Sequence, residues 1–216
     1  MELIVIAVYI IAFLYSVVLH EIAHGFVANM FGDDTAKVSG RLSLNPLVHI
    51  DFIGSIMVPL LLVFSNAGIL FGWAKPVPVN PYRLEKRPVS YRLVTMAGIF
   101  TNFSLAIFSI VILKITTQLF ALAPNNLGIL FFTILFQVNV VLAVFNSLPL
   151  PGFDGFNFLA SFSFVSRLLA KTPFGNPLFM ARYGLLVSIG LLFFLMPFIS
   201  SIFSFIFGLF ITIFNL

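Results

Sequence analysis

The sequence predicts an all-α polytopic membrane protein, and its length and composition carry this prediction. Of its 216 residues, 61% are hydrophobic and only 8% are charged, and phenylalanine occurs 29 times. A water-soluble globule is nearer one half apolar and about one quarter charged. At about 20 residues per span, the chain can form about five to six transmembrane or re-entrant helical segments. We therefore expect one integral-membrane domain over residues 1–216, with a core at about 3–156 and C-terminal helices at about 157–216.

The charges and the cysteine content exclude several other classes of protein. The net charge of +4 comes from scattered loop residues with no basic stripe, so we expect a lipid bilayer as the environment and no nucleic acid as a partner. The chain has no cysteine, which excludes disulfides and thiolate metal ligands. No Lys or Arg precedes the first apolar run, as it would in a signal peptide, so we expect a retained first span.

The first half of the chain is expected to hold one span, a small β element and a second apolar block. The span covers residues 3–31 and ends at a Gly-Asp-Asp stop. Residues 35–55 alternate between apolar and polar, which predicts a small membrane-associated β element or extended chain. The apolar block covers residues 52–71, and Pro59 interrupts it. Residues 72–88 are expected to be loop or edge strand, because their prolines cannot donate to a central ladder.

The second half is expected to be helical. Spans are predicted at residues 91–119 and 127–148, and a further apolar run covers residues 178–216. Pro197 divides that last run, so we expect one span followed by a returning or interfacial helix.

The stretch "LHEIAH" places three chemically reactive side chains near the far end of the first span. His20 and His24 are four residues apart, so on a helix both imidazoles project from one face at about 6 Å, as two ligands of one metal require. Glu21 lies about 100° around the helix and can reach a water molecule on that metal. This spacing is typical of zinc hydrolases. The structural alternative is that the histidines only link helices, but such groups are costly at membrane depth unless they serve a function.

A catalytic zinc ion needs a third protein ligand, and two residues remain as candidates. One is His49, the only other histidine, which can equally be a satisfied histidine at the interface. The other is Asp154, which follows an apolar span in "NSLPLPGFDGF". The prolines break the helix there and the glycines allow close approach of the backbone, so an unwound segment could present the aspartate; an ordinary interfacial turn is the alternative.

Five motifs together resemble the site-2 protease family of intramembrane zinc metalloproteases, in its compact branch without a PDZ domain. The motifs lie within about residues 20–156 and read, in order, "HEIAH", "GRLSLNPLVHIDFIGS", "FGWAKPVPVNP", "MAGIFTN" and "FNSLPLPGFDG". The resemblance implies one Zn²⁺ per chain, held by His20, His24 and Asp154, with Glu21 as the general base. It also implies that Asn146 contacts the substrate or its oxyanion.

The chain departs from the family pattern at two positions. It has Gly98-Ile99 where the family usually has Gly-Pro, and Gly152 where the family has proline. These departures affect the local backbone rather than the ligand set. Asn102 matches the family's asparagine in "MAGIFTN", although a polar link between helices explains it equally well.

The topology follows from bringing His24 and Asp154 to one metal. The spans before these two residues must run in the same direction, which requires that residues 52–71 form a re-entrant segment or a hairpin that returns to its own side. The basic loops then share one side, which the positive-inside rule assigns to the cytoplasm of a cell membrane. The resemblance predicts an intramembrane protease acting on transmembrane protein substrates. A metal-ion transporter and an inactive protein that binds transmembrane helices are the alternatives.

Overall fold

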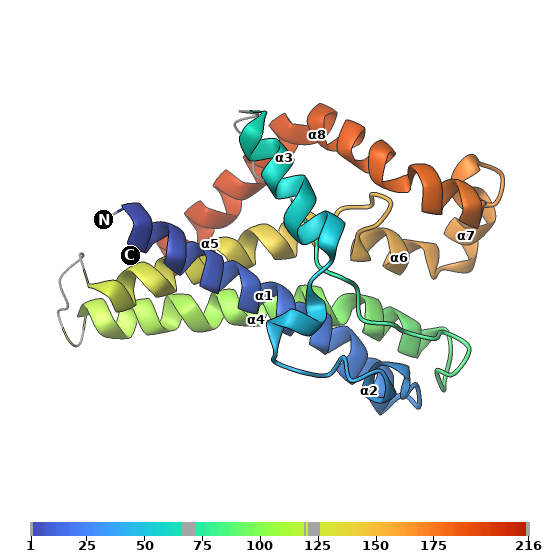
Figure 1. Cartoon of the computed structure of the whole chain (residues 1–216), viewed down its shortest axis with the longest axis horizontal. Helices are drawn as coiled ribbons and strands as arrows, with labels where there is room; N and C mark the ends of the chain where they lie inside the picture. The colour runs from blue at the N-terminus through green and yellow to red at the C-terminus, as the bar shows by residue number, and fades with distance from the viewer. Residues whose placement is uncertain (1, 66–71, 119, 121–125, 215–216) are drawn as a thin grey trace.

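The computed structural model describes residues 2–65, 72–118, 120 and 126–214, and Figure 1 shows a bundle of helices. Its elements in chain order are α1 (Glu2–Met30), α2 (Thr35–Val38), η1 (Pro46–His49), η2 (Phe52–Met57), α3 (Val58–Phe64), α4 (Val89–Gln118), α5 (Leu127–Ser147), α6 (Asp154–Ala160), α7 (Ser163–Leu169), η3 (Pro173–Gly175) and α8 (Pro177–Phe214). Helices α1, α4 and α5 and the stretch Leu186–Phe210 of α8 are long and apolar enough to cross a membrane. The described residues confirm the predicted helical architecture, and these four helices support a membrane protein.

Helices α1, α4 and α5 form the core of the bundle and lie side by side along the long axis of the molecule (Figure 1). Their bounds agree closely with the spans predicted at residues 3–31, 91–119 and 127–148. The ribbon colours show that α1 and α5 run in one direction and α4 in the other. The predicted parallel course of the first span and the span before Asp154 is therefore confirmed.

Small and β-branched residues allow α4 and α5 to pack closely against each other. Ala106 on α4 and Val140 on α5 are fully buried, within one cluster that includes Phe136. Phenylalanines from the C-terminal half of α8 pack against the outside of this cluster, and the rings of Phe136 and Phe207 lie 5.6 Å apart, edge to face. In lipid such close packing, rather than the hydrophobic effect, holds helices together.

Helix α8 corrects the expectation that Pro197 ends a span. The helix continues through this proline to Phe214, and its ribbon changes direction midway in Figure 1. Pro197 faces outward, where its ring displaces no packed neighbour. A proline removes one backbone hydrogen bond and bends a helix, and membrane helices tolerate such a bend.

The segment that holds η2 and α3 leaves the bundle and returns to its starting point. The Trp73 amide donates to the Gly54 carbonyl at 3.1 Å, and the Ser55 hydroxyl donates to the Trp73 carbonyl at 2.8 Å. The Lys75 amide donates to the carbonyl of His49 at 2.8 Å. Residues 66–71 of the predicted block lie outside the described part of the chain. The described residues that flank the block meet, as the predicted hairpin requires, and its return to its own side of a membrane stays a prediction.

The predicted β element is wrong: residues 35–55 and the described residues 72–88 contain no strand. Side chains, rather than a neighbouring strand, satisfy the extended backbone here. The Val77 amide donates to the Glu21 carboxylate at 2.8 Å, and the Asn80 amide donates to the buried Asp33 carboxylate at 2.5 Å. We call residues 75–80, which lie extended against α1, the strap. Its prolines, Pro76 and Pro78, have no amide hydrogen to offer a partner strand.

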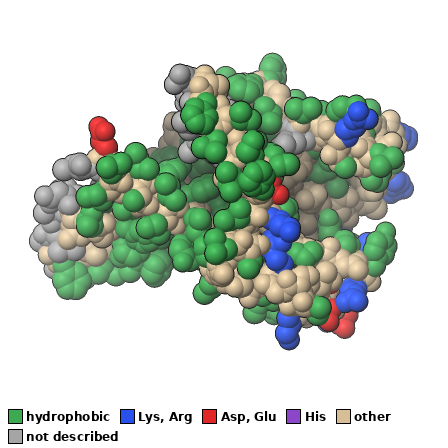
Figure 2. Space-filling view, in the orientation of Figure 1, with side chains coloured by type: hydrophobic (Ala, Val, Ile, Leu, Met, Phe, Trp, Pro, Cys, Tyr) green, Lys and Arg blue, Asp and Glu red, His purple; other side chains and the backbone are tan. Residues whose placement is uncertain are grey.

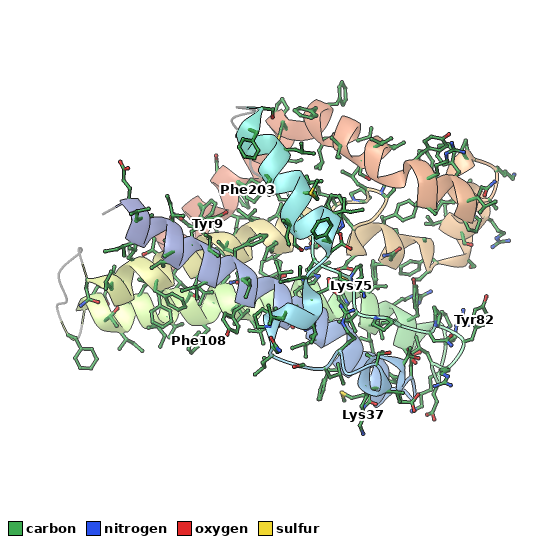
Figure 3. All side chains as sticks on the ribbon, in the orientation of Figure 1. Tyr9, Lys37, Lys75, Tyr82, Phe108 and Phe203 are labelled. Atoms are coloured by element: carbon green, nitrogen blue, oxygen red, sulfur yellow. The ribbon has the colours of Figure 1, made fainter. Side chains whose placement is uncertain are left out.

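Charged and apolar side chains separate along the bundle. On the face shown in Figure 2, Lys and Arg side chains gather in the half that holds α2 and α7, and hydrophobic side chains cover the other half. Figure 3 labels Tyr9 and Phe108 in the apolar half, and Lys37 and Tyr82 in the charged half. The bundle therefore has one polar end and a long apolar body, as a membrane protein requires.

Candidate metal centre

Helix α1 presents two imidazoles on its buried face. His20 and His24 are one helical turn apart and are 6% and 9% exposed. Their Nε2 atoms lie 3.1 Å apart, and the rings meet edge to face. The predicted placement of both histidines on one side of the first span is therefore correct.

A helix break brings Asp154 to the same point. Helix α5 ends at Ser147, before Pro149, and Gly152 adopts a φ of +89°, which proline cannot reach. Helix α6 then folds back against the end of α5, where a Cβ on Gly155 would overlap the Ser147 carbonyl. Asp154 is the first residue of α6, and its Oδ2 lies 3.2 Å from the Nε2 atoms of His20 and His24.

The three atoms form a nearly equilateral triangle that fits one tetrahedral metal ion. The sides measure 3.1, 3.2 and 3.2 Å. Bonds of about 2.0–2.1 Å place neighbouring ligands of a tetrahedral zinc ion about 3.3–3.4 Å apart. A Cβ on Gly98 of α4 would overlap both imidazoles, so only glycine leaves room at this face of the triangle. Two nitrogens and one oxygen are also a donor set that zinc accepts.

The other ring nitrogens hold the imidazoles in place. His24 Nδ1 lies 2.7 Å from the Val94 carbonyl, and His20 Nδ1 lies 2.6 Å from the side-chain oxygen of Asn102. Both partners accept hydrogen bonds, so each Nδ1 donates, and in a neutral imidazole the Nε2 then carries the lone pair that faces Asp154. Three acceptor atoms then face one another, an arrangement that needs positive charge between them.

A metal ion or protons can supply that positive charge. When protons occupy the Nε2 atoms, burial acts to raise the pKa of Asp154, but hydrogen bonds and charge from the protonated His20 and His24 outweigh it and lower the pKa to about 2. The carboxyl group is therefore ionised at neutral pH, as a metal ligand must be.

Glu21 lies beside this cluster but is held by a different part of the chain. Its Oε2 accepts a hydrogen bond of 2.8 Å from the Val77 amide of the strap, and its charge acts on His24. Arg41 fixes the strap, because its Nη2 donates to the Lys75 carbonyl at 2.6 Å and to the Pro76 carbonyl at 3.3 Å. Sequence reasoning did not find these contacts, since no local pattern pairs Glu21 with Val77.

The two remaining candidates do not join the cluster of described metal-binding groups. His49 Nε2 donates to the Ser43 carbonyl at 2.9 Å, so this histidine braces the connection between α1 and α4. Asn146 donates to the Leu142 carbonyl of its own helix at 2.9 Å. The group of residues that could share an ion contains His20, His24 and Asp154, which leaves Asp154 rather than His49 as the third candidate ligand.

Comparison with known proteins adds chemistry to this geometry. The chain is 41% identical over 153 residues to "Putative zinc metalloprotease YwhC" of Bacillus subtilis, an alignment that covers 69% of this chain and 66% of that protein. It is 34% identical over 152 residues to "Putative zinc metalloprotease Rip2" of Mycolicibacterium smegmatis, which covers 69% of this chain and 55% of that protein. For the Mycobacterium tuberculosis protein of the same name, the identity is 33% over 149 residues, covering 68% and 54%.

The chain is homologous to these proteins. Their names describe them as zinc metalloproteases, and in this chain His20, His24 and Asp154 form a group that could hold a metal ion. The chain aligns with less than two thirds of the length of each relative. No protein-family profile matches the chain, and no solved structure matches it.

Proposed function

We propose that this protein is an intramembrane zinc metalloprotease of the site-2 protease family, which hydrolyses peptide bonds within or near transmembrane helices of other membrane proteins. The observation that carries the proposal is the triangle of His20, His24 and Asp154 beside an intact Glu21. A purely structural zinc site would not need the glutamate. The relatives' names supply the reaction, and the apolar body of the bundle supplies the membrane.

The residues of the chain divide the chemistry among them. Zinc, when bound, supplies a Lewis acid that polarises the scissile carbonyl and makes water more acidic. We assign Glu21 to take the proton from the attacking water and to pass it to the leaving amine. Its Oε2 is held by Val77, so we assign the transfer to Oε1. Asn146 is proposed to hold the substrate or the developing oxyanion.

The membrane sidedness is also a proposal. Every Lys and Arg except Lys114 lies between α1 and α4, between α5 and α8, or in the first two turns of α4 and α8, toward the end of the bundle that holds α2 and α7. The positive-inside rule assigns that end to the cytoplasmic face of the plasma membrane. Because the chain has no cysteine, single cysteines can report on this arrangement. Ser39→Cys and Tyr82→Cys should react with an impermeant maleimide only in inverted vesicles; labelling from opposite sides would contradict the hairpin topology.

The decisive test of the proposed activity compares two matched changes on α1. Glu21→Gln should lower cleavage of single-span membrane proteins in proteoliposomes by at least about 10²-fold, because the general base is lost, and should leave zinc content unchanged. Glu2→Gln makes the same chemical change at the other end of the helix and should leave cleavage intact. Unchanged cleavage in Glu21→Gln would contradict the mechanism. Zinc flux that persists in that variant would favour a transporter.

A further inference from the structure

A continuous chain of buried polar side chains links α1, α5 and α4 to His20. Ser16 lies on α1, Asn139 on α5 and Asn102 on α4, and each is 0% exposed. Asn139 Nδ2 lies 2.8 Å from the Ser16 oxygen, and Asn102 Nδ2 lies 2.8 Å from the Asn139 oxygen. Asn102 in turn contacts His20 Nδ1 at 2.6 Å. These hydrogen-bonded side chains thus connect all three core helices through the buried interior of the bundle.

Two backbone carbonyls fix the direction of the hydrogen bonds at the start of this chain. The Ser16 hydroxyl donates to the Ala12 carbonyl at 2.7 Å, so its oxygen accepts from Asn139. The same amide nitrogen of Asn139 donates to the Leu135 carbonyl at 2.8 Å. A carbonyl can only accept, so the NH₂ end of Asn139 must face Leu135 and Ser16. The oxygen of Asn139 is then the end that faces Asn102.

The remaining directions follow in sequence. Because the Asn139 oxygen only accepts, Asn102 must donate its NH₂ to it and turn its own oxygen toward His20. The His20 Nδ1 must then carry a proton, and in the neutral ring its Nε2 keeps the lone pair that faces Asp154. No solvent reaches the three polar side chains, so water cannot compensate for a reversed amide.

We propose that Ser16 and Asn139 are positioning residues that set the tautomer and ring orientation of His20 through Asn102, and thereby prepare it to bind zinc. This inference rests on the proposed metal site and deepens it. A metal-ligating histidine needs a partner on its other nitrogen, and the loss of such a partner typically costs 10- to 100-fold in metal affinity.

A comparison with His24 shows why the proton position on His20 depends on a series of hydrogen-bonded side chains. His24 Nδ1 faces the Val94 carbonyl directly, and this backbone atom leaves only one proton arrangement. His20 instead faces an asparagine, whose two ends differ only in which atom is oxygen and which is nitrogen. With nothing behind it, Asn102 could present its NH₂ to Nδ1, which would place the ring proton on Nε2 and block the metal-facing lone pair. Asn139 and Ser16 remove that alternative.

Zinc affinity, measured by chelator competition on purified full-length protein, tests the proposal without reference to cleavage. Asn139→Leu should weaken zinc binding at least about tenfold, since it removes the acceptor for Asn102. Asn139→Asp, protonated on the oxygen that faces the Leu135 carbonyl, keeps an acceptor toward Asn102 and should bind zinc within about threefold of the wild type. Ser109→Ala is the matched control for Ser16→Ala, because Ser109 is also fully buried but bonds only its own helix at Leu105. Ser16→Ala should weaken binding more than Ser109→Ala does.

A second readout observes the proton itself. The chain has only three histidines, so the ¹⁵N spectrum of metal-free protein labelled at histidine can be assigned by single His→Gln changes. In Asp154→Ala, which removes the carboxylate that would itself attract a proton to Nε2, neutral His20 should carry its proton on Nδ1, and an Nε2-protonated form should appear when Asn139→Leu is added. An Nε2 proton on neutral His20 in Asp154→Ala would overturn the proposal, even if no variant at Asn139 folds.

The outcomes separate this inference from the proposed function. Equal zinc affinity in Asn139→Leu and Ser109→Ala, with an unchanged tautomer, would refute the positioning role. Zinc binding by Asn139→Asp as weak as by Asn139→Leu would refute it as well. A wild type that binds zinc but cleaves nothing, together with the expected His20 tautomer in Asp154→Ala, would instead refute the protease and leave the positioning role standing.

Discussion

Helices α4 and α8 are both apolar enough to cross a membrane, but they bury very different surfaces. In the most apolar 18-residue stretch, 44% of the residues of α4 are buried, against 11% for α8. Helix α4 buries Asn102 and Ser109, and its Gly98 leaves room for the two imidazoles. Helix α8 instead exposes Phe193 and Phe194, whose side chains are 66% and 75% exposed. Hydropathy therefore predicts both helices, whereas the small and polar residues indicate which helix packs against the metal centre.

This difference has a physical basis in the bilayer. A phenylalanine on a lipid-facing surface is in an environment as apolar as a protein interior, so its exact position matters little. A buried asparagine or serine must find a hydrogen-bond partner, because no water is present to replace it. Changes at the positions of α4 that face the histidines should thus affect the metal centre, and changes at the lipid-facing phenylalanines of α8 should affect at most packing. The predictions below test this contrast, beginning with the largest effect.

The sharpest test replaces a glycine on each helix by the same residue. Gly98→Ala on α4 would place a methyl group against both imidazoles, so bound zinc should fall from one per chain to near zero and cleavage should be lost. Gly190→Ala on α8 has no atom within 4 Å of the added Cβ and should leave both unchanged. Zinc content by atomic emission and a cleavage assay measure the outcome. Full zinc occupancy in Gly98→Ala would contradict the proposed difference between α4 and α8.

We expect an intermediate loss of cleavage when the strap is loosened. The strap is not an apolar segment, so hydropathy does not identify it. Arg41→Ala removes the donor to the Lys75 and Pro76 carbonyls and loosens the segment that holds Glu21. Cleavage should fall about tenfold, equivalent to about 1.4 kcal/mol of transition-state stabilisation, while zinc affinity is retained. Lys37→Ala, which removes an exposed cation from the same connection, should be neutral. An equal loss in both variants would show that charge alone is responsible.

The sequence alone predicted the features of the metal centre that depend on a single helix. The spacing of His20 and His24 fixes their common face, and the break at Pro149 marks where an aspartate can be presented. The β prediction failed because the partners of the strap are distant in the chain: Val77 binds Glu21, and Asn80 binds Asp33. Alternating patterns report which backbone is extended, but they do not report whether a strand or a side chain satisfies it.

The polar chain behind His20 was beyond sequence reasoning for a related reason. Asn102 had two equally good explanations, a contact near the site and a link between helices, and the structure shows that it is both. Ser16 and Asn139 give no local signal, since a serine or asparagine in a membrane helix usually bonds its own backbone or a neighbouring helix. Their role depends on how three helices are rotated about their axes, which hydropathy does not determine.

The smallest effect is expected within α8 itself and would sharpen the contrast between its two faces. Phe207 packs on Phe136 of α5, whereas Phe205 is 70% exposed. Phe207→Ala should lower stability by about 1 kcal/mol, because in lipid only the lost packing counts, and Phe205→Ala should change it by less than about 0.5 kcal/mol. Unfolding in a mixed-micelle denaturant titration measures both. Neither variant should change zinc content, since α8 contributes no residue to the triangle of His20, His24 and Asp154. A loss of zinc in Phe207→Ala would mean that the packing of α8 sets the geometry of the centre as strongly as α4 does.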